Sequence, residues 1–244
     1  MQESLILPDW DAPAIVRACV TTRLGGVSSM PYASLNLGAH VGDDPAAVTA
    51  NRQKLMTMLA LDAEPLWLNQ VHGDGVVDVA SAAGCDADAS VSHAPGGVCV
   101  VMTADCLPVL FCSHRGDEVA AAHAGWRGLA AGVLESTLSR MLTDNPDIMA
   151  WLGPAIGPTA FEVGDEVREV FLADDPESES AFVANRPGHW LADIYRLARL
   201  RLTRAGVTRI GGGNECTYTD SRRFFSYRRD GVTGRMASLI WIQQ

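Results

Sequence analysis

Three residues of types that ligate zinc or copper, or that act as nucleophile and base, fall at predicted turns of this 244-residue sequence. Cys106 separates two β-forming runs, His123 ends a third run just before a helix, and His72 lies in the loop NQVHG. A packed core does not need a Cys and a His at such turns. Three protein ligands leave one tetrahedral position of a zinc ion free for water, which is the pattern of a catalytic site. Water held there would have a pKa of about 7 and act as a nucleophile at neutral pH.

Cys106 and the two histidines also admit other interpretations. They lie 34 and 17 positions apart, whereas local zinc motifs place their ligands in tight pairs, so the spacing is not itself a signature. Cys106 could instead be a nucleophile with a histidine as its base, in the manner of cysteine hydrolases. A third interpretation makes Cys106 a small buried side chain and both histidines solvated loop residues. The residue types are the same in all three cases, so the residues alone leave the choice open.

Several arginines are candidates for the recognition of phosphate or carboxylate. Arg127 follows Gly-Trp at the start of a predicted helix, where its charge reinforces anion binding at that helix end. Arg23 stands beside a Gly-Gly pair, whose N–H groups can face an anion. Arg228 and Arg229 are further candidates, although surface salt bridges are the favoured interpretation for this pair. Asp105 precedes the turn cysteine, where it is expected to orient a ligand, move a proton or cap the turn, and it joins the candidate substrate- or phosphate-binding residues.

Hydrophobic and β-forming runs predict the elements that hold these residues. Short runs bounded by turn residues predict strands at 15–22, 66–68, 76–79, 98–102, 108–112, 118–122, 149–152, 207–210 and 236–242. Helical patterns predict helices from 45 to about 59, capped by Asp43 or Asp44, and at 129–142, 165–171 and 190–205. Pro108 lacks an N–H, so its strand is expected to be interrupted or at an edge there. FFSYRR is typical of a strand-like run, and DDPESES of an acidic surface loop.

The order of these elements mixes βα units with hairpins. Such a pattern indicates an α/β or mixed α+β fold of packed layers with mixed sheets, and not a regular doubly wound sheet or a barrel. With 244 residues, of which 48% are hydrophobic, the chain is long enough to bury a large core. No Pro/Ser/Gly-rich linker and no charge run divides it, so one domain spanning residues 1–244 is expected.

Composition argues against several partners. The net charge of −10 lacks the basic footprint that nucleic-acid backbones require. No apolar stretch of about 18 residues is present to span a membrane, and the first residues lack a secretory signal. The six cysteines form no CxxC pair and are expected to be free thiols. The cytoplasm is therefore the expected compartment, with neither nucleic acid nor membrane as the main partner.

Eight short motifs, taken together, resemble the bacterial laccase-domain family. In chain order they are TRLGGVS, SLNLGAHVGDDP, WLNQVHG, TADCLPVLF, AAHAGWRGL, LGPAIGP, FEVGDEV and FFSYRRDGVTGR. The match extends from about Thr21 to Trp241, which is nearly the whole chain. Members of this family were first called multicopper polyphenol oxidases and are now described as purine nucleoside phosphorylases with adenosine deaminase activity.

This resemblance implies a fold and a set of ligands. The fold would be a single-domain, four-layer α/β/β/α sandwich with mixed sheets. The metal ligands, which are also the expected catalytic residues, would be the His of NQVHG (His72), the Cys of TADC (Cys106) and the His of AHAGWRG (His123). All three motifs are intact in this chain. Zinc is the implied metal, with copper as the alternative.

The resemblance also implies two reactions. They are phosphorolysis of adenosine, inosine and methylthioadenosine, and hydrolytic deamination of adenosine. Purine nucleosides and phosphate are therefore the expected partners, on a monomer or small homo-oligomer. Two other enzymes stay open: a cysteine-type amidase that edits a peptidoglycan precursor, and a copper-dependent polyphenol oxidase, although six histidines are few for several coppers. An inert metal- or nucleotide-binding module is the alternative from a different class.

Overall fold

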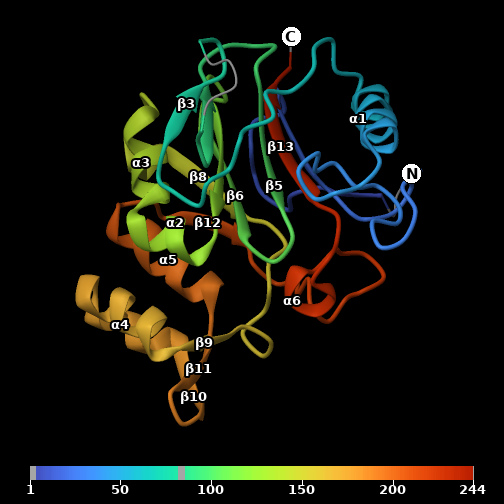
Figure 1. Cartoon of the computed structure of the whole chain (residues 1–244). Coiled ribbons are helices and arrows are strands. Elements are labelled where there is room, and N and C mark those ends of the chain that lie inside the picture. The colour runs from blue at the N-terminus through green and yellow to red at the C-terminus, as the bar shows by residue number, and fades with distance from the viewer. Residues whose placement is uncertain (1–3, 82–85, 244) are drawn as a thin grey trace.

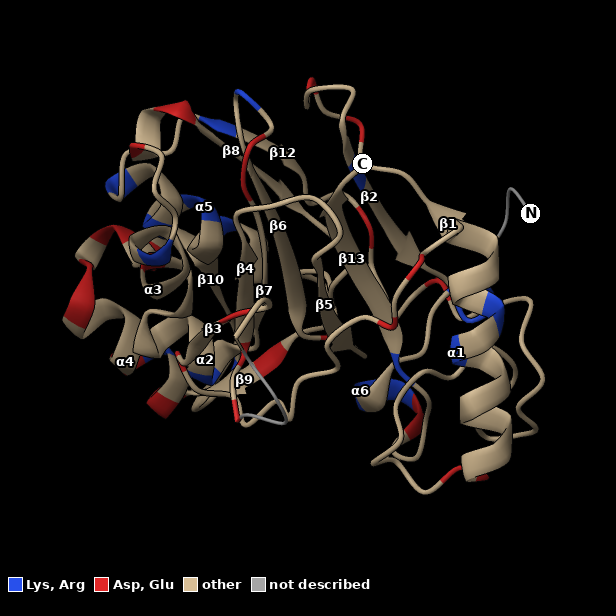
Figure 2. Ribbon diagram, turned by 90° about the horizontal axis from the view of Figure 1, so that it is seen from above, with Lys and Arg blue, Asp and Glu red and all other residues tan. Residues whose placement is uncertain are grey.

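Two β-sheets pack face to face in the computed structural model, which describes residues 4–81 and 86–243. Helices cover the outer face of each sheet, so the layers follow the order α/β/β/α (Figure 1). In Figure 2, α1 (Pro45–Leu59) lies on the opposite side of the two main sheets from α2 (Trp126–Ala131), α3 (Val133–Arg140), α4 (Asp165–Asp174) and α5 (Ile194–Arg204). This arrangement confirms the expected layered α/β fold.

The larger sheet has six strands in the spatial order β12-β8-β6-β7-β4-β3. Their bounds are β3 (Val76–Asp78), β4 (Ala89–Ser92), β6 (Leu107–Ser113), β7 (Val119–Ala124), β8 (Ile148–Leu152) and β12 (Arg209–Gly212). The outer pairs β12–β8 and β3–β4 are parallel and the inner pairs antiparallel, so the sheet is mixed as expected. In the central β6–β7 hairpin, Leu107 pairs with Ala124 and Pro108 with His123. This register brings the start of β6 and the end of β7 to one end of the sheet.

The smaller main sheet is antiparallel and has the order β1-β2-β13-β5. Its strands are β1 (Leu5–Ile6), β2 (Val16–Thr21), β5 (Val98–Thr103) and β13 (Met236–Ile242). A three-stranded sheet lies next to α4 in Figure 1 and contains β9 (Glu162–Gly164), β10 (Phe182–Arg186) and β11 (His189–Ala192). The other helical segments described are α6 (Tyr227–Asp230) and the 3₁₀ turns Asn145–Asp147 and Pro176–Ala181. Among the described residues, no helix is both long and apolar enough to cross a membrane.

Alternation along the strands divides their side chains between separate cores, because successive residues of a strand face opposite sides of the sheet. On β6, Leu110 points between the two main sheets, whereas Val109 and Phe111 point toward α2, α3 and α5. On the far side, Leu55 of α1 packs with Leu239 of β13. Each main sheet is thus covered on both faces, and its strand ends are the places where polar groups can gather.

The first helix and the strands around Cys106 follow the sequence predictions. The helix runs from Pro45 to Leu59, and the Asp44 carboxylate caps it by accepting the Ala46 N–H at 3.0 Å. Strands β5, β6 and β7 agree with the expected strands within two residues at each end. The strands that carry Cys106 and His123 were therefore predictable from the local sequence pattern.

Two predicted helices have different bounds in the structure. The expected helix at 129–142 is two helices, α2 and α3, because Gly132 between them has a left-handed φ of 99°. The expected helix at 190–205 begins only at Ile194, where Asp193 caps it by accepting the Arg196 N–H. The residues before it belong to β11, since Trp190 pairs with Val163 of β9.

Four further expectations were wrong in detail. Residues 66–68 bury part of their apolar surface, but they form no strand. FFSYRR buries both phenylalanines and then turns into the short helix α6, whose Ser226 cap accepts the Arg229 N–H. The acidic DDPESES segment contains a 3₁₀ turn. Pro108 lies inside the central strand β6, which is not interrupted there. The neighbouring strand β8 pairs only from Val109 onward, so the missing N–H breaks no ladder bond on that side.

Candidate metal centre and adjoining pocket

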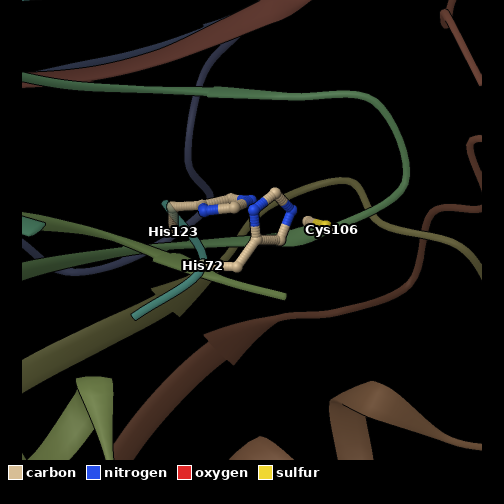
Figure 3. Close-up of side chains that lie close together, drawn as sticks. All are labelled: His72, Cys106 and His123. Carbon is tan, nitrogen blue, oxygen red and sulfur yellow. The ribbon is translucent and has the colours of Figure 1, made fainter. Parts of the chain in front are cut away.

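His72, Cys106 and His123 converge at one end of the larger sheet, and their ligand atoms all lie within 4.8 Å of one another (Figure 3). Cys106 occupies the turn between β5 and β6, and His123 lies near the end of the adjacent strand β7. His72 reaches them from the loop before β3, with a left-handed φ of 62°. The two imidazole rings meet edge to face, with centroids 4.8 Å apart. The structure thus brings together the three residues that the sequence singled out.

A buried carboxylate, Asp88, positions both histidines. Its Oδ1 atom lies 2.7 Å from Nδ1 of His123, which leaves Nε2 of that ring to face the site. Its oxygens also accept the backbone N–H groups of Val71, His72 and Gly73 at 3.1, 2.9 and 2.7 Å. Asp88 is fully buried. One residue therefore fixes the orientation of one imidazole ring and the backbone that carries the other, a common arrangement behind metal-bound histidines.

The electrostatics of the cluster favour a thiolate. Burial raises the pKa of Cys106, but the charge of His123 and hydrogen bonds from both histidines outweigh it and lower that pKa to about 6. Burial lowers the pKa of His123, yet the Cys106 thiolate and the Asp88 carboxylate outweigh it and raise that pKa to about 9. Burial likewise acts to raise the pKa of Asp88, and its hydrogen bonds with His123 and Gly73 bring it below the ordinary value. The thiolate is the form of cysteine that binds metals and attacks electrophiles.

Gly125 leaves the space in which the three ligands meet. A Cβ atom at this position would lie 2.9 Å from Sγ of Cys106 and 3.2 Å from Cδ2 of His72. The backbone of Gly125 has an ordinary φ of −63°, so its lack of a side chain matters for space and not for conformation. Two imidazole nitrogens and one thiolate form a donor set that suits zinc or copper. The residues present therefore fit a metal ion.

A pocket of about 320 Å³ opens beside this cluster. It is lined by His72, Ala104, Asp105, Cys106, Trp126, Arg127, Ile156, Phe161, Ile194, Tyr227 and Arg228. These residues come from the turns and helices at the sheet end, including α2, α5 and α6. Small-molecule sites are typically concave, mostly apolar and about 300–1,000 Å³ in volume, with a few polar groups. This pocket has those properties, with aromatic walls and a metal-type donor set at one side.

The other predicted site residues lie in different positions relative to the pocket. Arg127 lines the pocket, with its guanidinium 4.5 Å from the centre of the Trp126 ring. Asp105 lies in the pocket wall, but its carboxylate accepts hydrogen bonds from Thr217 and from two groups of the α6 segment. Arg23 lies outside the pocket residues, where it donates to the Ala33 carbonyl at 2.9 Å and stacks on Phe225. The structure thus brings Arg127 and Asp105 to the cluster and places Arg23 elsewhere.

The sequence did not point to Asp88 or to a role for Gly125, and for Arg228 it favoured a salt bridge over ligand binding. Asp88 stands in the segment DADAS, directly before the short buried strand β4. A buried acidic residue opposite a histidine is a usable signal, but only once the pairing of β4 with β7 is known. Gly125 is part of a visible motif, and its role needs the three-dimensional contacts. Arg228 was expected in a surface salt bridge, and it faces the pocket instead.

The layered fold and the His-Cys-His centre are those of a metal-associated α/β protein. A family model described as multi-copper polyphenol oxidoreductase laccase matches residues 17–243. The chain is 59% identical to the purine nucleoside phosphorylase YfiH of Escherichia coli, over 98% of each protein. It is 58% identical to a purine nucleoside phosphorylase of Pseudomonas aeruginosa, also over 98% of each. The crystal structure of the Neisseria meningitidis protein NMB0706 matches with a TM-score of 0.96 and 52% identity, covering 99% of this chain and 100% of that one. The chain belongs to the multi-copper polyphenol oxidoreductase laccase family, which confirms the resemblance of its motifs.

Proposed function

We propose that this protein is a metal-dependent purine nucleoside phosphorylase that acts on adenosine, inosine and methylthioadenosine and also deaminates adenosine hydrolytically. The observation that carries the proposal is the meeting of three metal-type donors within 4.8 Å at the edge of a pocket with aromatic walls. The names of the relatives in Escherichia coli and Pseudomonas aeruginosa support an enzyme that acts on purine nucleosides. His72, Cys106 and His123 are the proposed ligands, zinc the proposed metal and copper the alternative.

The walls of the pocket suit a purine base. Trp126, Phe161 and Tyr227 line it together with Ile156 and Ile194. Stacking of a base on an aromatic side chain contributes about 1–3 kcal/mol and tolerates different bases, because every base has a π-face. A site built in this way accepts adenosine, inosine and methylthioadenosine alike. The volume of about 320 Å³ lies at the small end of ligand pockets, as a nucleoside requires.

Phosphorolysis needs little covalent chemistry from the chain. A phosphate oxygen forms a bond to the anomeric carbon of the ribose, and the bond from that carbon to the purine N9 breaks. The electron pair passes to the base, which takes up a proton and leaves as free purine. The chain's task is to hold phosphate and nucleoside in line, and such positioning can supply several kcal/mol of the barrier.

Deamination needs water at the purine carbon that bears the amino group. A bound metal ion would supply a water of lowered pKa for this step. Asp88 keeps His123 oriented toward the site, and the Cys106 thiolate gives the centre one negative ligand. The five described cysteines are free, as suits a reducing compartment. We extend the proposal to a cytoplasmic enzyme whose residues 1–244 form one catalytic domain.

Product analysis combined with metal analysis tests the proposal. Purified protein should contain about one zinc per chain, the number that a single three-ligand site allows. Adenosine incubated with phosphate should release adenine and ribose 1-phosphate, and without phosphate it should yield inosine. Alanine at position 72, 106 or 123 should abolish both reactions. Full activity of metal-free wild-type protein would disprove the metal role.

One observation favours a second candidate function. Cys106, His123 and Asp88 form a chain of thiolate, imidazole and carboxylate, and this is the arrangement of a cysteine hydrolase. An amidase acting on a peptidoglycan precursor would use it without metal. Metal-free protein should then release product from such an amide, and Cys106→Ala should stop it, whereas dependence on added zinc would exclude this mechanism.

A copper-dependent polyphenol oxidase finds less support in the geometry. Within residues 4–81 and 86–243, His72, Cys106 and His123 form the only group of three or more His, Cys, Asp or Glu ligands close enough to hold a metal ion. A multicopper centre needs further histidines to hold additional ions.

A further inference from the structure

Two arginines from separate elements line the pocket beside the candidate metal centre. Arg127 belongs to α2 and Arg228 to α6. In the described part of the chain, neither guanidinium forms an ion pair with a carboxylate. Other arginines do: Arg186, Arg201, Arg204, Arg223 and Arg229 each pair with Asp or Glu. Two arginines without an ion-pair partner thus line one pocket, in a chain whose net charge is −10.

Both guanidinium groups are held in place by aromatic rings of the same pocket. Arg127 lies 4.5 Å from the centre of the Trp126 ring, and Arg228 lies 5.7 Å from the centre of the Phe161 ring. Arg228 also donates from Nη1 to the Glu162 carbonyl at 2.8 Å. A guanidinium carries five N–H donors, so most of its donors stay available to a ligand. Positioned but unpaired arginines are suited to planar, bidentate recognition of an anion.

The position of Arg228 is tied to that of the metal centre through Asp105. The Asp105 carboxylate accepts the backbone N–H of Arg228 at 2.7 Å and the Ser226 hydroxyl at 3.0 Å. Its other oxygen accepts the Thr217 hydroxyl at 2.6 Å. Because Asp105 directly precedes Cys106, these hydrogen bonds join the segment that carries Arg228 to the turn that carries the thiolate. An anion bound by Arg228 would lie in the pocket that His72 and Cys106 also line.

We infer that Arg127 and Arg228 form the subsite for inorganic phosphate. The inference rests on the proposed phosphorylase function and names its phosphate-binding residues. A nucleoside is uncharged, so of the two substrates only phosphate responds to a pair of positive charges. Arg127 and Arg228 therefore position the attacking oxygen, while the aromatic walls bind the base. The phosphate group of a nucleotide has the same chemistry, and the experiment separates the two sources.

Direct binding provides the first arm of the test and does not depend on activity. Titration of zinc-loaded wild-type protein with inorganic phosphate should give saturable binding in a calorimeter. Arg228→Gln and Arg127→Gln should each weaken it about tenfold or more, because each removes charge-assisted hydrogen bonds. Arg228→Lys should retain part of the affinity, because lysine keeps the positive charge but lacks the planar pair of donors of a guanidinium. Both side chains are solvent-exposed, so the variants should keep the wild-type circular dichroism spectrum.

The matched control is Arg115→Gln. Arg115 is exposed and pairs with Asp117 in the turn at the other end of the β6–β7 hairpin from Cys106. The seven residues of β6 separate the two ends, about 20 Å at the usual rise of a strand. This variant changes the net charge by the same amount and should leave phosphate binding unchanged. An equal loss of phosphate affinity in Arg115→Gln would show that the affinity depends on net charge and not on contact with Arg127 and Arg228, and it would overturn the proposed subsite.

Kinetics provide the second arm. In adenosine phosphorolysis, Arg228→Gln should raise KM for phosphate about tenfold or more, while Arg115→Gln should leave that KM unchanged. Wild-type protein that binds phosphate but releases no adenine would disprove the proposed function and leave the subsite standing. Absence of phosphate binding, or unchanged binding in both glutamine variants, would disprove the subsite. Adenosine monophosphate is the competitor: if it binds through Arg228 while inorganic phosphate does not, the arginines recognise a nucleotide and the inference is wrong.

Discussion

The Oδ1 atom of Asp88 lies 2.7 Å from Nδ1 of His123, in a position where the carboxylate is completely buried. The same carboxylate accepts three consecutive backbone N–H groups of the His72 loop. Ligands from two distant parts of the chain are therefore oriented by one side chain. The geometry of the candidate centre depends on a residue that does not itself belong to the ligand set.

Replacing Asp88 by Asn should weaken metal binding while retaining all three ligands. The amide offers one oxygen in place of two and directs N–H groups toward backbone donors, so the His72 loop and the His123 ring lose their fixed orientation. Loss of such a partner typically lowers metal affinity by about 10–100-fold. Competition with a chromophoric zinc chelator measures the change. Asp74→Asn, on the exposed part of the same loop, is the control and should bind zinc like the wild type.

Gly125→Ala should disrupt the centre without unfolding the protein. The new methyl group would lie 2.9 Å from Sγ of Cys106, so the thiolate and the His72 ring must separate. The backbone conformation of Gly125 is one that alanine adopts freely. We expect zinc content to fall well below one per chain with little change in melting temperature. Gly75→Ala is the control, because its methyl group would meet only ordinary contacts at 3.6 Å or more. Full zinc content in Gly125→Ala would contradict the assigned role.

Local pattern in the sequence was sufficient for the elements next to Cys106. The runs on both sides of Cys106 are continuous and apolar, as strands buried on both faces require, and they became β5 and β6. Asp44 and Pro45 marked the start of α1 because capping is a short-range effect. Ligand residues at turns between such elements were visible for the same reason.

The residues that position the ligands could not be predicted from the sequence, because their roles depend on contacts between residues that are distant along the chain. Asp88 and His123 are 35 positions apart and meet only through the pairing of β4 with β7. FFSYRR is rich in aromatic residues and resembles a strand, but Asp105 accepts the Arg228 N–H and Ser226 caps the turn, so the segment forms α6. Tertiary hydrogen bonds overrode local propensity at this point, so the position of Arg228 beside the pocket could not be predicted from the local pattern.

Asp105 accepts hydrogen bonds and also adopts a left-handed backbone conformation, and two substitutions should separate these roles. Alanine removes the acceptor of three hydrogen bonds, two of them buried, and it is also strained at the left-handed φ of 91°. The free energy of unfolding should fall by about 2–4 kcal/mol. Asparagine retains an acceptor and tolerates that conformation, so Asp105→Asn should lose about 1 kcal/mol. Urea denaturation measures both changes, and equal losses in the two variants would contradict this account of Asp105.

Alkylation of metal-free protein should show the charge state of Cys106. Because its pKa is lowered to about 6, the thiolate fraction, and with it the rate of reaction with iodoacetamide, should rise through about pH 6 and level off by pH 7.5. For an ordinary thiol, the midpoint of this rise lies near pH 8.5. Cys112 is buried, and burial raises its pKa to about 12, so it should react far more slowly. Peptide mapping distinguishes the sites, and Cys85 lies outside the described residues.

Zinc should protect one thiol selectively. Coordination occupies the lone pair that attacks iodoacetamide, so saturation with zinc should slow alkylation of Cys106 many-fold. Cys216 is the internal control, because it is partly exposed, its pKa is also lowered, and it lies outside the ligand set. The rate at Cys216 should stay the same with and without zinc. Equal rates at Cys106 in both conditions would exclude it as a ligand and shift the balance toward the cysteine-hydrolase mechanism, in which the thiolate must remain free to attack its substrate.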